Sequence, residues 1–136
     1  MAASRPLILF VCVHNAGRSR MAEAFFNAKA KGKWRAISAG TEPAPHPHPE
    51  VVETMQAAGV PLQPGQGRML TAELADSATR VIGMGCDVDS ACPALSVPLE
   101  DWELEDPKGR TDEDVAQIRD EIERRVDRLI SELGCL

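Results

Sequence analysis

The stretch FVCVHNAGRS, from Phe10 to Ser19, is the feature that most constrains the fold of this chain. It follows an apolar run at residues 6–11, and such a run predicts a strand buried on both faces of a parallel sheet. It precedes a segment, residues 21–28, whose apolar side chains share one face of a helix. We therefore expect Cys12 at the carboxyl end of a strand and an arginine–serine pair at the start of the next helix.

A strand, loop and helix in this order can bind an oxyanion. The loop wraps backbone N–H groups around a concavity, and the helix amino terminus points at it. The same positive field favours the thiolate form of a cysteine. Arginine offers a planar fork to two anion oxygens, and the serine can donate a hydrogen bond to sulfur. The predicted catalytic groups are Cys12, Arg18 and Ser19, and the predicted substrate-binding residues are Val13, His14, Asn15, Ala16, Gly17 and Arg18.

Two other interpretations of this stretch are weaker. A cysteine after an apolar strand is often only a small buried side chain, but the Arg-Ser pair six residues after Cys12 disfavours that reading. A nucleotide-binding loop would need a lysine and two spaced glycines, which are missing here.

The rest of the chain alternates strands and helices. We expect further strands at 34–39, 79–84 and 94–97. Helices are expected from Pro49 to Ala58, from Thr71 through Leu74 and from Thr111 onward. This order predicts an α/β fold, a single three-layer domain with a four-stranded parallel sheet flanked by helices. Because ligands bind beyond the carboxyl ends of such strands, Cys12 and Cys86 can meet over one site.

Length, charge and cysteine content limit the number of domains, the cellular location and the kinds of partner that this chain can have. A chain of 136 residues predicts one domain over residues 1–136. The amino-terminal apolar run is too short for a signal peptide or a membrane span, so we expect a cytoplasmic protein without a membrane partner. Its four cysteines are then reactive thiols and not a disulfide scaffold. The net charge of −6 disfavours nucleic acid as a partner, and we expect a monomer.

The loop resembles the signature of the low-molecular-weight protein tyrosine phosphatase family, Cys-x5-Arg-Ser with Asn three residues after the Cys. Asn15 matches the position at which the family needs a left-handed turn. The resemblance is closest to the arsenate reductases of that fold. Gly17 replaces the second loop cysteine of the phosphatases, Asp106-Pro107 is followed by Lys108-Gly109 and not by an aromatic pair, and the chain has no Tyr. The resemblance covers almost the whole chain.

The resemblance implies roles for residues outside the loop. Asp106 aligns with the general acid that protonates the leaving oxygen, although an Asp-Pro in an acidic loop is by itself more often a turn. Cys86 and Cys92 match two cysteines that pass oxidation outward in the thioredoxin-coupled branch. Their spacing lies between that branch and the one that uses a low-molecular-weight thiol with glutaredoxin or mycoredoxin, so both donors stay open. Two inconsequential loop cysteines are the alternative, and Cys-x5-Cys is a poor zinc spacing.

Support of the loop forms the last set of predictions. In part of the family a Glu, the loop Asn and a strand Ser hold a potassium ion, and Glu23, Asn15 and Ser38 match them. Arg68 aligns with a further ligand, so its fixed positive charge is expected to replace the ion, with no metal bound. The alternative is an exposed loop charge, whose ion pair contributes about 0–1 kcal/mol. His46 and His48 lie in a proline-rich stretch that favours a solvated loop over a metal site.

These features predict an arsenate reductase for arsenic detoxification. Cys12 attacks the arsenate oxyanion, a second thiol attacks Cys12, and arsenite leaves. No bound cofactor is needed, because electrons come from thioredoxin or a low-molecular-weight thiol. The alternatives are a phosphatase acting on phosphotyrosine or small phosphate esters, and an oxyanion sensor without turnover. Intact Cys12, Arg18 and Asp106 disfavour the sensor.

Overall fold

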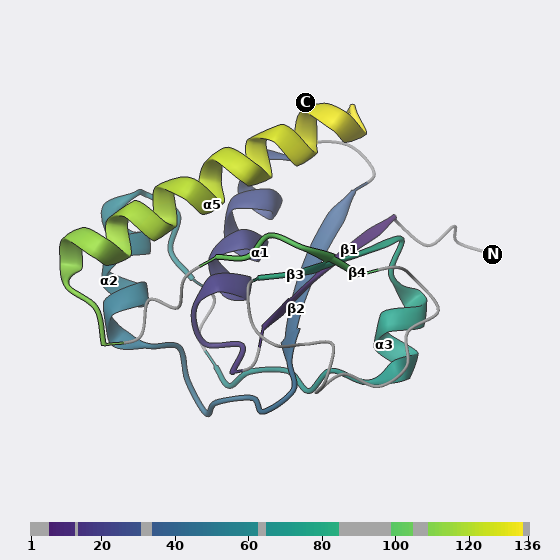
Figure 1. The fold of residues 1–136 in the computed structure, drawn as a ribbon, viewed down its shortest axis with the longest axis horizontal. Helices are drawn as coiled ribbons and strands as arrows, with labels where there is room; N and C mark the ends of the chain where they lie inside the picture. Colours follow the sequence, from purple (N-terminus) through teal and green to yellow (C-terminus); the bar gives the residue numbers. More distant parts are fainter. Residues whose placement is uncertain are drawn as a thin grey trace.

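The computed structural model describes residues 6–12, 14–30, 34–62, 65–84, 99–104 and 109–134. Their centre is a sheet in the order β2-β1-β3-β4 (Figure 1). The strands are β1 (Leu7–Cys12), β2 (Arg35–Gly40), β3 (Arg80–Gly83) and β4 (Leu99–Asp101). All the neighbouring strands pair in parallel, which confirms the predicted α/β class and its four-stranded parallel sheet.

Strand β1 lies inside the sheet and ends at the place where such sheets bind ligands. Cys12 is in register with Gly40 of β2, and Val11 is in register with Gly83 of β3. The chain leaves β1 toward β2 on one side and later returns to β3 on the other. The carboxyl end of β1 is therefore a topological switch point, where the connections diverge and leave a crevice.

Helices lie on both faces of this sheet. Helices α1 (Arg18–Lys29), α2 (Pro49–Ala57) and α5 (Asp112–Leu133) lie on one face, and the short α3 (Ala72–Ser77) lies on the other (Figure 1). The predicted caps are present, because the hydroxyls of Thr71 and Thr111 accept hydrogen bonds from Leu74 N and Asp114 N. These bonds satisfy N–H groups that the first helical turn leaves without a partner.

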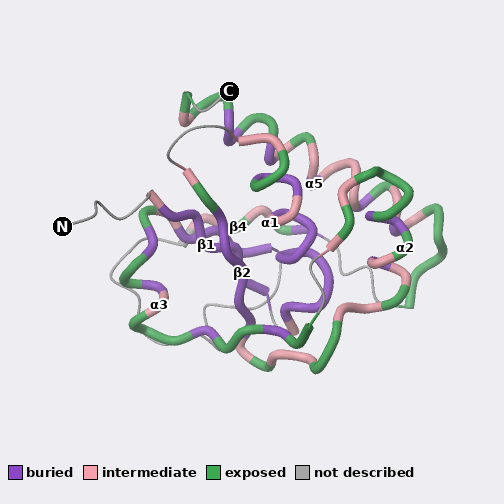
Figure 2. The backbone as a smooth tube through the Cα atoms, turned by 180° about the vertical axis from the view of Figure 1, so that it is seen from behind, coloured by how far each residue is buried: buried purple, intermediate pink, exposed green. Residues whose placement is uncertain are grey.

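The side chains of successive β1 residues pack into two separate hydrophobic cores, one on each face of the sheet. Ile8, Phe10 and Cys12 face the helices α1, α2 and α5, whereas Leu9 and Val11 face α3. Every residue of β1 is buried for this reason (Figure 2), and its sequence is continuously apolar because side chains alternate between two covered faces. The core on the α1 side holds the larger side chains, among them Phe25, Phe26, Met55 and Ile122.

The fourth strand differs from its prediction. The predicted strand at 94–97 lies outside the described residues, and β4 occupies Leu99–Asp101, which was not predicted. Its sequence, LED, shows no apolar alternation, so the pairing with β3 and not its own pattern defines it. Arg80 of β3 and Glu100 of β4 form a two-pronged ion pair at 2.8 and 2.6 Å along this edge.

Within the described residues, none of the helices combines the length and the hydropathy that crossing a lipid bilayer would require.

Candidate active site

The loop between β1 and α1 carries the predicted nucleophile. Cys12 ends β1 and is only 3% exposed, and α1 begins at Arg18. Asn15 has a left-handed backbone, with φ of 48°, as expected from the family signature. Gly17 precedes the helix and provides no side-chain cap. The amino terminus of α1 therefore faces the loop without a capping side chain, as an anion site requires.

A chain of hydrogen bonds runs from the sulfur of Cys12 into the protein. Ser19 Oγ lies 2.8 Å from Cys12 Sγ and accepts a hydrogen bond from Asn15 Nδ2 at 2.9 Å. Asn15 Oδ1 accepts from the backbone N–H of Arg68 at 2.8 Å, and this donor fixes which way the amide points. Because the Ser19 oxygen accepts from Asn15, its single proton can be donated to the sulfur. The network thus directs the Ser19 proton at the Cys12 sulfur.

Arg18 is held at the centre of the site by two backbone carbonyls. Its Nη1 donates to Met84 O and to Leu104 O, each at 2.9 Å, and the residue is 7% exposed. Nη1 has only two N–H donors, and both are used here. An anion held by two prongs of this guanidinium must therefore use its Nε–Nη2 edge. Met84 follows β3 and Leu104 follows β4, so Arg18 links the ends of two strands.

The segment that contains Gly67 and Arg68 closes the back of the loop. Gly40 N donates to Arg68 O at 2.8 Å, and Gly67 N donates to Ala44 O at 2.7 Å. A Cβ atom at Gly67 would lie 3.1 Å from Asn15 Cβ and 3.1 Å from His14 O. Only glycine allows so close an approach without displacing its neighbours. The sequence did not point to Gly67, since the contact joins segments far apart in the chain.

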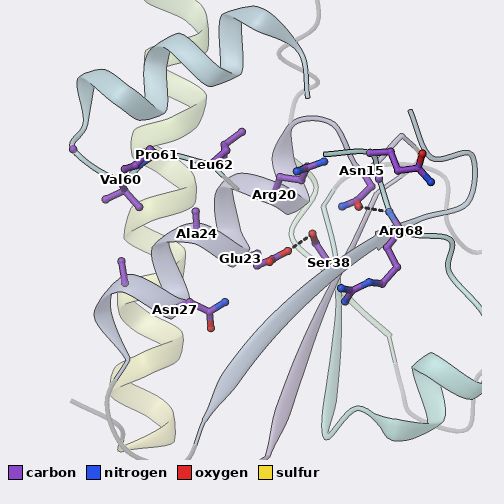
Figure 3. A pocket seen from close by; sticks show the side chains of 14 residues that line it. Asn15, Arg20, Glu23, Ala24, Asn27, Ser38, Val60, Pro61, Leu62 and Arg68 are labelled. Carbon is purple, nitrogen blue, oxygen red and sulfur yellow. Dashed lines mark hydrogen bonds between the residues drawn. The ribbon is translucent and has the colours of Figure 1, made fainter. Parts of the chain in front are cut away.

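A pocket of about 750 Å³ lies behind the loop, on the side of Asn15 (Figure 3). Helix α1 provides one wall with Arg20, Glu23 and Asn27, and Ser38 of β2 provides another. Neither Cys12 nor Arg18 is among its lining residues. This pocket is therefore distinct from the anion-binding concavity. The chain of hydrogen bonds through Asn15 connects the two.

Glu23 and Ser38 are direct partners in this pocket. The Ser38 hydroxyl donates to Glu23 Oε1, as Figure 3 shows. Arg20 Nη1 donates to Gly65 O at 2.9 Å. Burial lowers the pKa of Arg20, whereas the charges of Glu23 and then Cys12 act to raise it. Arg20 thus adds a positive charge to the pocket behind the loop. No sequence signal points to Arg20, because in the sequence it is an ordinary helix residue, and only the fold buries it.

The predicted loop-support residues come together, but Arg68 acts through its backbone. Its N–H bonds Asn15, while its guanidinium lines the same pocket as Glu23 (Figure 3). No ion pair between Arg68 and Glu23 is formed within the part of the chain that the structure describes. The oxygens of Asn15 and Ser38 already take part in hydrogen bonds, and two guanidinium groups line the pocket. This donor set suits a potassium ion poorly.

The histidines of the loops have local partners. His14 Nδ1 lies 3.1 Å from Glu42 O, and His46 Nδ1 lies 3.2 Å from Pro47 O. Within the described residues, no group of three His, Cys, Asp or Glu side chains is placed to hold a metal ion.

Several predicted site residues lie outside the described residues. These are Val13, Cys86, Cys92 and Asp106. Cys135, for which no role is predicted, also lies outside the described residues. Met84, which the structure describes, lies two positions before Cys86. Leu104, which is also described, lies two positions before Asp106. Both of these flanking residues are bonded to Arg18.

Comparisons with known proteins cover nearly the whole chain. A family model described as low molecular weight phosphotyrosine protein phosphatase matches residues 7–135. A protein of Halobacterium salinarum, provisionally named an arsenate reductase, is 39% identical over 130 residues, which are 92% of this chain and 91% of that protein.

Two further relatives differ in the electron donor that their names give. A glutaredoxin arsenate reductase of Synechocystis is 31% identical over 129 residues, 93% of this chain and 98% of that protein. The solved structure of a thioredoxin-dependent arsenate reductase of Corynebacterium glutamicum has a TM-score of 0.82 and 33% identity. That match covers 98% of this chain but only 64% of the longer Corynebacterium chain.

Proposed function

Because the chain belongs to the low-molecular-weight phosphotyrosine protein phosphatase family, and its named relatives include arsenate reductases, we propose that it reduces arsenate to arsenite. The observation that carries the proposal is the contact of 2.8 Å between Cys12 Sγ and Ser19 Oγ at an anion-binding loop. It provides a nucleophilic sulfur next to the helix terminus and to Arg18, which bind a tetrahedral oxyanion.

The first step forms a bond between sulfur and arsenic. The Cys12 thiolate attacks the arsenic of arsenate, and one arsenate hydroxyl group leaves. Asp106 gives this oxygen a proton, so that it departs as water. Arsenic remains in the +5 state, now bound to Cys12. The Nε–Nη2 edge of Arg18 and the backbone N–H groups of the loop hold the remaining oxygens.

The second step transfers two electrons. The thiolate of Cys86 attacks Cys12 Sγ, a disulfide forms, and the sulfur–arsenic bond breaks with its electron pair going to arsenic. Arsenic leaves in the +3 state as arsenite, and the two thiols are oxidised. Cys92 then attacks Cys86, which restores Cys12 and leaves a Cys86–Cys92 disulfide. The position of Cys86, two residues after the Arg18-bound Met84, supports its role.

An external dithiol closes the cycle by reducing that disulfide. We propose thioredoxin as the donor, since Cys86 and Cys92 would form a protein disulfide that thioredoxin can attack. A low-molecular-weight thiol with glutaredoxin or mycoredoxin is the other donor class, and it would need only Cys12. Mass spectrometry of enzyme after one turnover without reductant separates the two. A Cys86–Cys92 disulfide is expected, whereas Cys12 joined to an external thiol with both other cysteines reduced would assign the second class.

Arsenite production provides the direct test of the function. Purified protein is supplied with arsenate and either thioredoxin with its reductase, or a low-molecular-weight thiol with its redoxin. We expect turnover with the first system and none in Cys12→Ser. Cys135→Ser is the matched control, since it removes a thiol outside the proposed mechanism and should keep full activity. Normal arsenite production by Cys12→Ser would refute the mechanism.

The second candidate is a phosphatase, which the description of the family model favours. It would use the same nucleophile and acid, and water would end the cycle in place of a thiol. Reductant separates the two activities: phosphate release continues without an electron donor, whereas arsenate reduction stops after one turnover.

A further inference from the structure

Glu103 has a backbone conformation that its residue type disfavours. Its φ is 53°, and among the described residues the only other residue with positive φ that is not glycine is Asn15 of the anion loop. A left-handed backbone is sterically unfavourable for an L-residue such as glutamate. Its side chain is exposed, so burial of that side chain does not offset the cost. Such strain persists only where the surrounding structure imposes it, and it is concentrated at functional sites.

The residues on either side of Glu103 impose the conformation. On one side, Trp102 N donates to Gly83 O at 2.8 Å, and the Trp102 ring lies 5.7 Å from that of Phe10. On the other side, Leu104 buries its side chain in the core on the α1 face. The Asp101 carboxylate accepts from Glu103 N at 2.9 Å and stabilises the turn between them. The hydrogen bond from Glu103 N to Asp101 thus closes a short turn just after β4, in which Glu103 keeps its left-handed backbone.

The turn delivers one specific group to the candidate active site. The carbonyl of Leu104, the residue after Glu103, accepts from Arg18 Nη1 at 2.9 Å. Met84 O accepts the other Nη1 proton. Together the two carbonyls fix the plane of the guanidinium, and hence the direction in which its Nε–Nη2 edge points. An arginine fork binds an oxyanion well only when that edge is aligned with two of the oxygens.

We propose that Glu103 is a positioning residue for the oxyanion. Its left-handed backbone directs the Leu104 carbonyl onto Arg18, and this contact aligns the guanidinium before the anion arrives. The backbone conformation and not the carboxylate performs the role. This inference rests on the proposed anion site, and it adds to that site a residue that touches neither the anion nor the nucleophile.

The test compares variants that differ in their tolerance of positive φ. Glu103→Gly accepts the left-handed conformation, Glu103→Gln keeps the side-chain shape without charge, and Glu103→Val strongly disfavours the conformation because it is β-branched. The matched control is Gly134→Val at the end of α5, where φ is 68° and no atom lies within 4 Å. For each protein we would measure the dissociation constant of inorganic phosphate, the KM and kcat for arsenate, and the melting temperature.

We expect Glu103→Val to raise the phosphate dissociation constant and the arsenate KM about ten-fold, which corresponds to about 1.4 kcal/mol. Glu103→Gly and Glu103→Gln should stay within about two-fold of wild type, given the tolerance of glycine for positive φ. Gly134→Val should lower the melting temperature without changing either constant. Should Glu103→Val not fold, Asp101→Ala weakens the same turn and is expected to raise both constants about three-fold, because it removes the exposed hydrogen bond to Glu103 N.

Two results would overturn the inference. One is a folded Glu103→Val, or Asp101→Ala in its place, with the phosphate affinity of wild type. The other is Glu103→Gln losing as much affinity as Glu103→Val, which would assign the effect to the charge. A wild type that neither binds phosphate nor reduces arsenate would refute the proposed function instead, so the two failures are distinguishable.

Discussion

At the scale of single residues, the site depends on which side chain donates each hydrogen bond and which accepts it. Asn15 donates to Ser19, and this leaves the Ser19 proton for Cys12. We expect Ser19→Ala to lower kcat about ten- to hundred-fold, because a hydrogen bond to a charged group contributes about 1.5–3 kcal/mol. Steady-state arsenite production measures this. The control is Ser77→Ala, which removes a serine bonded to Leu74 O in α3; an equal loss there would contradict the assigned role.

Arg18 shows the same dependence on geometry. Lysine has one nitrogen, so Arg18→Lys cannot bond Met84 O and Leu104 O and also present a planar edge to an anion. We expect at least a ten-fold rise in the arsenate KM together with a lower melting temperature, since two buried carbonyls lose a partner. Thermal unfolding and kinetics on the same sample check both parts. Near-normal KM in this variant would show that Arg18 does not bind the anion.

At the scale of elements, helix α1 covers the open edge of β2 with a side chain. Asn27 Oδ1 accepts from Ala36 N and Asn27 Nδ2 donates to Ala36 O, each at 2.9 Å. The amide thereby takes the place of a neighbouring strand at an edge that would otherwise be unpaired. We expect Asn27→Ala to lower the free energy of unfolding by about 1–2 kcal/mol, measured by urea denaturation. Asn27→Asp keeps only the acceptor, so its stability should lie between those of wild type and Asn27→Ala. If both variants were as stable as wild type, this role would be contradicted.

At the scale of the whole molecule, the first and last helices are joined by a lysine. Lys29 of α1 donates to Glu123 at 2.6 Å and to Asp127 at 2.8 Å, both on α5. Burial acts to lower the pKa of Lys29, but the bonds and charges of Asp127 and Glu123 outweigh it, so the pKa is raised. The stabilisation is therefore complete below the unfolded pKa of about 10.4, and it is lost as pH rises through the higher folded pKa.

The consequence is a pH-dependent difference between wild type and Lys29→Met. We expect the variant to be less stable by about 0.5–1 kcal/mol from pH 7 to 9, as for a partly exposed ion pair, and the gap to shrink at higher pH. Urea unfolding at a series of pH values measures it. A gap that widens above pH 10 would contradict the sign of the shift.

The sequence by itself determined the elements that depend on local pattern. The apolar run before Cys12 predicted a doubly buried strand, the threonines predicted two helix starts, and the alternation of strands and helices predicted the parallel sheet. The cysteine, arginine and serine of the loop were identifiable because their function requires a fixed spacing along one continuous stretch. Asn15, Glu23 and Ser38 were identified through the family resemblance.

Only the tertiary structure decided the contacts between distant segments. β4 has no pattern of its own and exists through its pairing with β3. Arg20 lies on a helix, and its partner Gly65 O comes from a segment far away in the sequence. Arg68 donates a backbone N–H to Asn15, and the sequence does not show whether a residue uses its backbone or its side chain. The groups that hold Arg18 are the backbone carbonyls of residues 84 and 104, and not their side chains. Apart from proline, all residues carry the same backbone groups, so the roles of these groups follow from where the fold places them.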